Sequence, residues 1–211
     1  MEESTSREKI LKKVRKALVS RGDSFYLNTD FNSPLFQTKK DLPEIIFAQM
    51  LREQKGNFIY CNNENEAIEQ LHHLFQFKKW GKPFFEEEEI FFFAEKSQIN
   101  KLPVTTAPGS RIVITLCECL VSDSGTVVVS SLQACGSRFI VDADVHIVIA
   151  FDSQMVQSIT EAFGYIEKKY ENQAPRHITF ITGPSKTADI EQELIYGAHG
   201  PAELYCFLIE G

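Results

Sequence analysis

Apolar residues along this chain follow two alternating periods, which together predict an ordered series of strands and helices. Short β-branched and aromatic runs are typical of buried strands, and segments with an apolar residue every three or four positions are typical of amphipathic helices. Strands are expected at residues 57–61, 90–93, 111–121, 126–130, 145–150, 176–180 and 204–209. Helices are expected at residues 4–21, 41–54, 64–77, 153–170 and 190–196. Because strands alternate with helices, we predict an α/β fold with a mostly parallel sheet flanked by helices, and the adjacent runs at 111–130 predict an inserted antiparallel hairpin.

The first forty residues differ in pattern from the remainder. Residues 4–21 have an amphipathic helical pattern with a basic face, and residues 22–40 have no clear period. We therefore expect an N-terminal arm of helix and linker over residues 1–40 and an α/β domain over residues 41–211. The basic helix is either a docking element for a membrane or a partner, or a solvated arm. The lack of an aromatic anchor on its apolar side favours the arm.

Charge and hydropathy exclude several classes of function. The net charge of −7 argues against binding a nucleic-acid backbone, although it leaves room for a local anion pocket. No apolar run approaches the length that spans a bilayer. The acidic, polar start of the chain lacks the features of a signal peptide, so we expect a cytoplasmic protein.

The cysteines offer little evidence of a chemical role, and buried core positions are the favoured interpretation of Cys117 and Cys119. The five cysteines are widely scattered, their number is odd and no Cys-x-x-Cys occurs, so neither a disulfide framework, a zinc site nor an iron–sulfur cluster is expected in this chain. Cys117 and Cys119 are two apart on an expected strand, which predicts that both face the same side of a sheet.

The stretch from Ile181 to Glu191 offers the most chemistry. An expected strand leads through a turn into the expected helix at 190–196, and such a turn presents free backbone N–H groups where open α/β sheets bind ligands. Within the turn, Gly183 permits a close approach of the backbone to a ligand. Ser185 and Thr187 then offer hydroxyl groups, and Lys186 offers a point charge suited to a carboxylate or phosphate. This pattern predicts a binding site for a small anionic or nucleotide-like ligand.

Two carboxylates and a histidine near this turn each have two interpretations. Asp189 either caps the expected helix or holds a substrate hydroxyl or ribose, and Glu191 is either a favourable first-turn charge or a catalytic base or nucleophile. His199, fixed between glycines and next to Gly200, is either a proton acceptor and ligand contact or a turn residue bonded to backbone. His146 lies in an apolar run and is assigned no role.

Three segments together closely resemble the LUD-domain family, whose best-known members are lactate-utilisation protein C subunits. They are Ser122-Asp123-Ser124-Gly125-Thr126, the run from Gly183 to Glu191, and Gly197-Ala198-His199-Gly200-Pro201. The resemblance covers about residues 41 to 210. It implies a fold like the NagB/RpiA/CoA-transferase group and a role in oxidising L-lactate to pyruvate. It also implies that the iron–sulfur clusters lie in partner subunits.

The first of these segments also has two interpretations. Asp123 and Gly125 are typical of a hairpin turn, whereas analogy with the CoA-transferase group would make Asp123 a nucleophile beside the ligand-binding Gly125 and Thr126. Relatives more often have Ala-Glu-Thr-Gly-Thr here, so the shorter side chain of Asp123 does not support a role that needs the longer reach of Glu.

Three hypotheses follow from the sequence. The first is a cluster-free subunit of a multi-component lactate-oxidation system, with iron–sulfur partner subunits and a small anionic or nucleotide-like ligand bound at the 183–189 turn, next to residues 123–126 and 199–201. The second is a stand-alone enzyme of the isomerase or CoA-transferase type that uses Asp123 or Glu191. The third is a non-catalytic binding or regulatory module. Each is compatible with a homo-oligomer.

Overall fold

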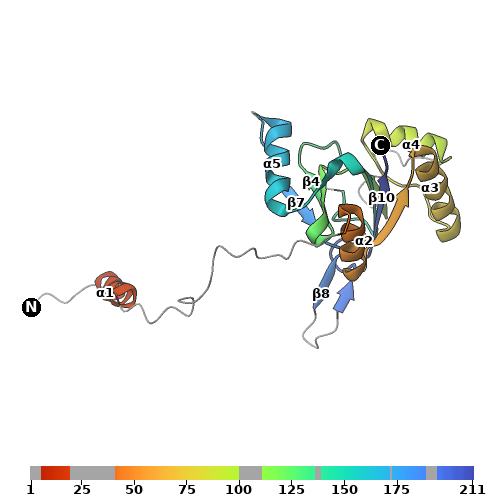
Figure 1. Ribbon diagram of the computed structural model, residues 1–211. Coiled ribbons are helices and arrows are strands. Elements are labelled where there is room, and N and C mark those ends of the chain that lie inside the picture. Colours follow the sequence, from red (N-terminus) through yellow and green to blue (C-terminus); the bar gives the residue numbers. More distant parts are fainter. Residues whose placement is uncertain (1–5, 20–40, 100–110, 136–138, 172, 189–193) are drawn as a thin grey trace, which may run out of the picture. The chain divides into compact units, whose positions relative to one another are not determined.

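The computed structural model describes residues 6–19, 41–99, 111–135, 139–171, 173–188 and 194–211 (Figure 1). The chain divides into two compact units, residues 1–39 and residues 40–211. In the first unit the predicted basic helix is confirmed as α1 (Ser6–Val19), with Glu8 in its first turn and Lys16 in its last turn. These charges are favourable at the two ends of the helix dipole.

A four-stranded, entirely parallel sheet forms the centre of the second unit. Its strands lie in the order β1 (Asn57–Cys61), β10 (Glu203–Ile209), β5 (Val145–Phe151) and β2 (Ile112–Thr115). Successive side chains of β10 enter opposite cores, with Leu204, Cys206 and Leu208 on one face and Tyr205, Phe207 and Ile209 on the other. Both faces of this sheet are therefore covered, as expected for parallel strands.

The predicted antiparallel hairpin is confirmed, but it belongs to a second sheet. That sheet has the order β6 (Met155–Val156), β3 (Cys119–Val121), β4 (Thr126–Ser130) and β7 (Ile178–Ile181). The expected single strand at 111–121 is broken at residues 116–118, where the chain passes from one sheet to the other. As a result, Cys117 packs in the core between the sheets, whereas Cys119 packs in the core on the outer side of the second sheet. The prediction that these two cysteines share a face is wrong.

Helices complete the layers on both sides. On the outer face of the parallel sheet, α3 (Glu64–Lys78) and α4 (Glu88–Lys96) pack side by side, and α5 (Ile159–Tyr170) covers the second sheet (Figure 1). The remaining helix, α2 (Pro43–Glu53), buries Phe47 and Leu51 in the core between the two sheets. Side-chain caps fix two of these helices, because Asn63 accepts the Glu66 N–H and Ser158 accepts the Glu161 N–H.

One predicted element is of the wrong type, and another begins at a different residue. Residues 90–93, expected as a strand, lie in α4, because Ile90, Phe93 and Ala94 recur at helical spacing and are buried together. The helix expected at 153–170 begins only at Ile159, where Ser158 provides its cap. The residues before it form a 3₁₀ turn, η3 (Asp152–Gln154), and strand β6.

All five cysteines are free and buried, and this burial was predicted for Cys117 and Cys119. Burial raises the pKa of Cys61 to about 11 and that of Cys119 to about 12, so both thiols stay protonated at neutral pH. In the part of the chain that the structure describes, no group of three potential metal-ligating side chains occurs. Among the same residues, no helix has the length and apolar character needed to cross a bilayer.

Candidate functional site

The turn at Gly183 leads into a hairpin instead of a helix. Strand β8 (Lys186–Ala188) pairs antiparallel with β9 (Leu194–Tyr196), so the helix predicted at 190–196 is wrong for residues 194–196. The Leu-Ile-Tyr sequence of β9 has high strand propensity, and backbone pairing with β8 satisfies its polar groups. Asp189 and Glu191 lie outside the described residues. The dipole expected from a helix over residues 190–196 is therefore not available to a ligand at this turn.

The second and third motif segments bond to each other. The Ser185 N–H donates to the Pro201 carbonyl (2.8 Å), and the Gly197 N–H donates to the Ser185 carbonyl (3.0 Å). The Ser185 hydroxyl donates to the His199 carbonyl (2.7 Å). These bonds hold the Gly-Pro-Ser turn against the Gly-Ala-His-Gly-Pro loop, although 12 or more residues separate the bonded groups. The lone pairs of the Ser185 hydroxyl remain able to accept a further hydrogen bond.

These segments enclose what we call the motif cavity, with a volume of about 320 Å³. That volume is at the small end of the range for ligand pockets. Four of the predicted site residues line it together, namely Gly183, Ser185, His199 and Gly200. The remaining lining residues are mostly apolar and come from β5, β7, β10 and the loops beside them: Ile140, Val141, His146, Thr179, Phe180, Ile181, Thr182, Pro184, Pro201 and Leu204.

Two of the predicted site glycines closely approach α2. Gly125 has a φ of +63°, and a Cβ on it would lie 2.3 Å from the Leu51 nitrogen. Gly183 has a φ of +86°, and a Cβ on it would lie 2.6 Å from the Gln54 carbonyl oxygen. Both positions therefore need glycine in order for the end of α2 to pack there. We expected the backbone at Gly183 to approach a ligand closely. In this structure it approaches the end of α2.

The other predicted site residues do not line the motif cavity. Asp123 is half-buried in the 3₁₀ turn η2 (Ser122–Ser124), and its N–H donates to the Gln157 carbonyl. Thr126 is buried, and its hydroxyl oxygen lies 2.7 Å from that of Thr182, which does line the cavity. The exposed ammonium of Lys186 donates to the Gln54 side chain (2.9 Å). Thr187 is exposed in the β8–β9 hairpin.

A buried histidine that received no role lines the motif cavity. His146, on β5, has no exposed surface, and its Nε2 lies 2.8 Å from the Thr115 hydroxyl. Its Nδ1 has no hydrogen-bond partner among the described residues. Burial lowers the pKa of His146 to about 3, so the ring is neutral at physiological pH. The only hint in the sequence was a lone histidine in an otherwise apolar strand. Such a histidine is more often a core residue whose hydrogen bonds are all made within the protein.

Comparison with known proteins identifies the family. The LUD domain pattern matches residues 105–209, which include all three motif segments. The chain belongs to the LUD domain family.

The relatives with curated names support this assignment. The chain is 36% identical over 107 residues to the lactate utilization protein C of Geobacillus thermodenitrificans, an alignment that covers 50% of this chain and 45% of the relative. It is 32% identical over 137 residues to that of Bacillus subtilis, covering 63% and 54%, and 25% identical over 189 residues to that of Oceanobacillus iheyensis, covering 87% and 75%. The first two alignments thus span about half the length of each relative.

A solved structure supports the fold. The crystal structure of a DUF162 family protein from Deinococcus radiodurans superposes with a TM-score of 0.53 at 13% identity, covering 79% of this chain and 96% of that one. At this identity the likeness concerns the fold alone, and it agrees with the predicted parallel sheet flanked by helices.

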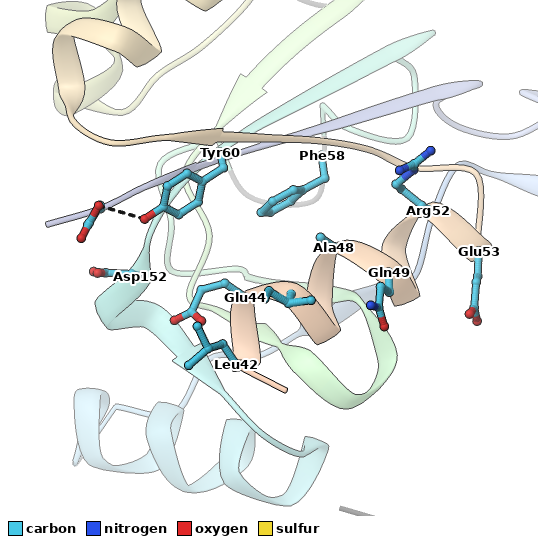
Figure 2. A pocket seen from close by; sticks show the side chains of 11 residues that line it. Leu42, Glu44, Ala48, Gln49, Arg52, Glu53, Phe58, Tyr60 and Asp152 are labelled. Atoms are coloured by element: carbon cyan, nitrogen blue, oxygen red, sulfur yellow. Dashed lines mark hydrogen bonds between the residues drawn. The ribbon is translucent and has the colours of Figure 1, made fainter. Parts of the chain in front are cut away.

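The second unit also contains a larger cavity, of about 920 Å³, which we call the α2 cavity (Figure 2). It is lined by none of the predicted site residues, and its lining comes from α2, β1 and the chain just beyond β5 and β10: Leu42, Glu44, Ile45, Ala48, Gln49, Arg52, Glu53, Phe58, Tyr60, Asp152 and Glu210. Figure 2 shows Phe58 facing Ala48 in the middle, with Tyr60, Glu44 and Asp152 at one end. The Tyr60 hydroxyl donates to Glu210 (2.9 Å), and this bond raises the pKa of Tyr60.

The position of the α2 cavity makes it a rival ligand site. It opens beside the carboxyl ends of β1, β5 and β10, where open α/β sheets usually bind ligands. The motif cavity instead lies at the amino ends of β5 and β10, next to His146 and Leu204. Sequence reasoning missed the α2 cavity because its lining residues come from four separate segments with no shared motif.

The acid sensitivity of the LUD domain is expected to depend on His146. The unfolded chain binds a proton at this ring below about pH 6.5, whereas the folded chain does so only near pH 3. The folded state therefore loses stability relative to the unfolded state as the pH falls from about 6.5 towards 3, and the loss from this ring is about 2 kcal/mol between pH 7 and pH 5.

Urea unfolding of the wild type and His146→Gln at pH 7 and pH 5 measures this contribution. We expect the variant to lose less free energy of unfolding than the wild type over this interval. His73→Gln, on the exposed side of α3, is the matched control and should behave as the wild type. Equal losses in the wild type and His146→Gln would show that the ring is protonated in the folded protein.

Proposed function

We propose that this chain is a cytoplasmic, cluster-free subunit of a multi-component system that oxidises L-lactate to pyruvate, and that it binds a small hydroxy or oxo acid of this reaction in the motif cavity. The named relatives, all lactate utilization protein C, support the place in lactate utilisation. The motif cavity supports the binding role, because two segments that mark the family, held together by Ser185, enclose it. This hydrogen-bonded cavity is the observation that carries the proposal.

The size and lining of the cavity favour a small ligand over a nucleotide. A volume of about 320 Å³ accommodates a three-carbon acid with ordered water. Hydroxyl groups of Thr179 and Thr182 are available as hydrogen-bond partners for its oxygens, and His199 lies exposed at the mouth. In this proposal the iron–sulfur clusters that carry the electrons lie in partner subunits.

The geometry gives less support to a stand-alone enzyme with Asp123 as nucleophile. Asp123 lies in the η2 turn that packs against α2, and it does not line the motif cavity. A covalent mechanism at Asp123 would therefore need a separate substrate site. We propose His199, Ser185, Gly183 and Gly200 as ligand contacts instead.

Filling each cavity in turn tests this proposal. Val141 lines the motif cavity and is 58% exposed, so Val141→Trp can fill the cavity without entering the core. Ala48→Trp fills the α2 cavity from the surface of α2 and serves as the matched control (Figure 2). We expect L-lactate, titrated by NMR into the full chain, to bind the wild type and Ala48→Trp equally. We expect Val141→Trp to weaken this binding about tenfold or more, because the added ring displaces the ligand.

Two results would contradict the proposal. One is a wild-type chain that binds neither L-lactate nor pyruvate. The other is binding that Ala48→Trp abolishes and Val141→Trp preserves, which would place the ligand in the α2 cavity.

A further inference from the structure

Nδ1 of His146 has no hydrogen-bond partner among the described residues. Buried polar groups without a hydrogen-bond partner are uncommon, because leaving one unpaired costs free energy. Nδ1 of His146 is such a group among the described residues, on a side chain with no exposed surface. The same side chain lines the motif cavity. The lining of the cavity therefore includes both an exposed residue, His199, and a buried residue, His146, one of whose ring nitrogens has no partner among the described residues.

The lining of the motif cavity indicates which part of a ligand meets this nitrogen. None of the described lining residues is Lys, Arg, Asp or Glu. The one lysine among the predicted site residues, Lys186, is bonded to Gln54 and does not line the cavity. A carboxylate at the inner end would lose its water without gaining an opposite charge, which is unfavourable. An uncharged oxygen, in contrast, can bond to the neutral imidazole there.

We propose that Nδ1 of His146 forms a hydrogen bond with the 2-hydroxyl or 2-oxo oxygen of the bound acid, and that the carboxylate of the acid points towards the mouth near His199. This inference rests on the proposed function, since it takes a small hydroxy or oxo acid as the ligand of the motif cavity. His146 is thus a ligand-binding residue that selects acids with an oxygen on the second carbon.

Thr115 allows the same ring to bind both forms of the acid. Its hydroxyl can donate to Nε2 or accept from it, and their separation of 2.8 Å fits either direction. When Thr115 donates, Nδ1 carries the proton and can donate to a keto oxygen. When Thr115 accepts, Nδ1 has a free lone pair and can accept from an alcohol. The His146–Thr115 pair therefore suits a cavity that holds an alcohol and the corresponding ketone in turn.

A double-mutant cycle between ligand and protein tests this inference. Propionate is L-lactate without the 2-hydroxyl, so the ratio of their affinities isolates the contribution of that group. In the wild-type full chain we expect L-lactate to bind about three- to tenfold more tightly than propionate, the size expected for one neutral hydrogen bond. In His146→Gln, whose amide can still reach Thr115, we expect the ratio to fall to within about twofold of one. His73→Gln should keep the wild-type ratio.

A second measurement uses the wild type alone and does not depend on the folding of the variant. In ¹⁵N spectra of the imidazole rings, L-lactate should shift the Nδ1 resonance of His146, and propionate should not. An unchanged affinity ratio in His146→Gln overturns the inference. So does an unmoved Nδ1 resonance when the amides of Gly183 and Gly200 shift, although lactate binding in the cavity would then still stand. If neither acid shifts those amides, the ligand assignment of the proposed function is wrong as well.

Discussion

Gly125→Ala is expected to lower the free energy of unfolding by about 3 kcal/mol or more. The residue has a left-handed φ of +63°, and the new Cβ would lie 2.3 Å from the Leu51 nitrogen and 2.7 Å from the Met50 carbonyl carbon. These are backbone atoms of α2, so no side-chain rotation can relieve the clash. The helix would have to move away from the hairpin turn, which would expose Phe47 and Leu51 of the core.

Urea unfolding followed by the fluorescence of Trp80, the single tryptophan, measures this loss. The control is Gly164→Ala, because Gly164 lies within α5 with no atom within 4 Å of an added Cβ. Alanine favours a helix, so this control should be neutral or more stable by up to about 1 kcal/mol. If Gly125→Ala unfolded at the same urea concentration as the wild type, α2 would not pack on the hairpin turn as described.

Lys169→Met is expected to lower the free energy of unfolding by about 2–3 kcal/mol, because it leaves a buried carboxylate without its counter-charge. Glu118 has no exposed surface, and its Oε2 accepts from the Lys169 ammonium (2.7 Å). Its Oε1 accepts from the hydroxyls of Ser130 (2.5 Å) and Tyr170 (2.7 Å). Burial lowers the pKa of Lys169, but the bond to Glu118 outweighs this effect and raises the pKa overall, so the ammonium is charged at neutral pH.

Two further variants separate the lost ion pair from the lost side chain. Lys168→Met removes the neighbouring exposed charge of α5 and should change the free energy of unfolding by less than about 0.5 kcal/mol. In Lys169→Met/Glu118→Gln, the neutral amide no longer needs a counter-charge, so part of the stability should return. A Lys169→Met protein as stable as the Lys168→Met protein would mean that Glu118 does not depend on this ion pair.

Sequence reasoning was most successful where burial alone determines the element. The runs that became β5 and β10 are apolar on both faces, as strands of a covered parallel sheet must be. Predictions from the sequence were wrong where contacts between distant segments decide whether a run forms a strand or a helix. Residues 90–93 contain strand-forming side chains, yet contacts with α3 and the parallel sheet favour a helix that buries Ile90 and Phe93.

The candidate site shows the same limit. The motif segments could be found from the sequence, and four of the predicted site residues in them line one cavity, but the hydrogen bonds of Ser185 could not be predicted from spacing. Gly125 and Gly183 looked like ligand-facing glycines because nothing in the sequence reveals that α2 packs against both. His146 looked like a core residue because only the structure shows that its Nδ1 has no partner among the described residues.

The central claim is that the motif cavity, and not the α2 cavity, holds a small hydroxy acid. The most direct test is a set of ¹H–¹⁵N NMR spectra of the full chain recorded during titration with L-lactate. We predict saturable shifts of the Gly183, Ser185 and Gly200 amides. Saturable shifts confined to the α2 cavity, at Ala48 and Tyr60, would contradict the claim, as would the absence of any saturable shift.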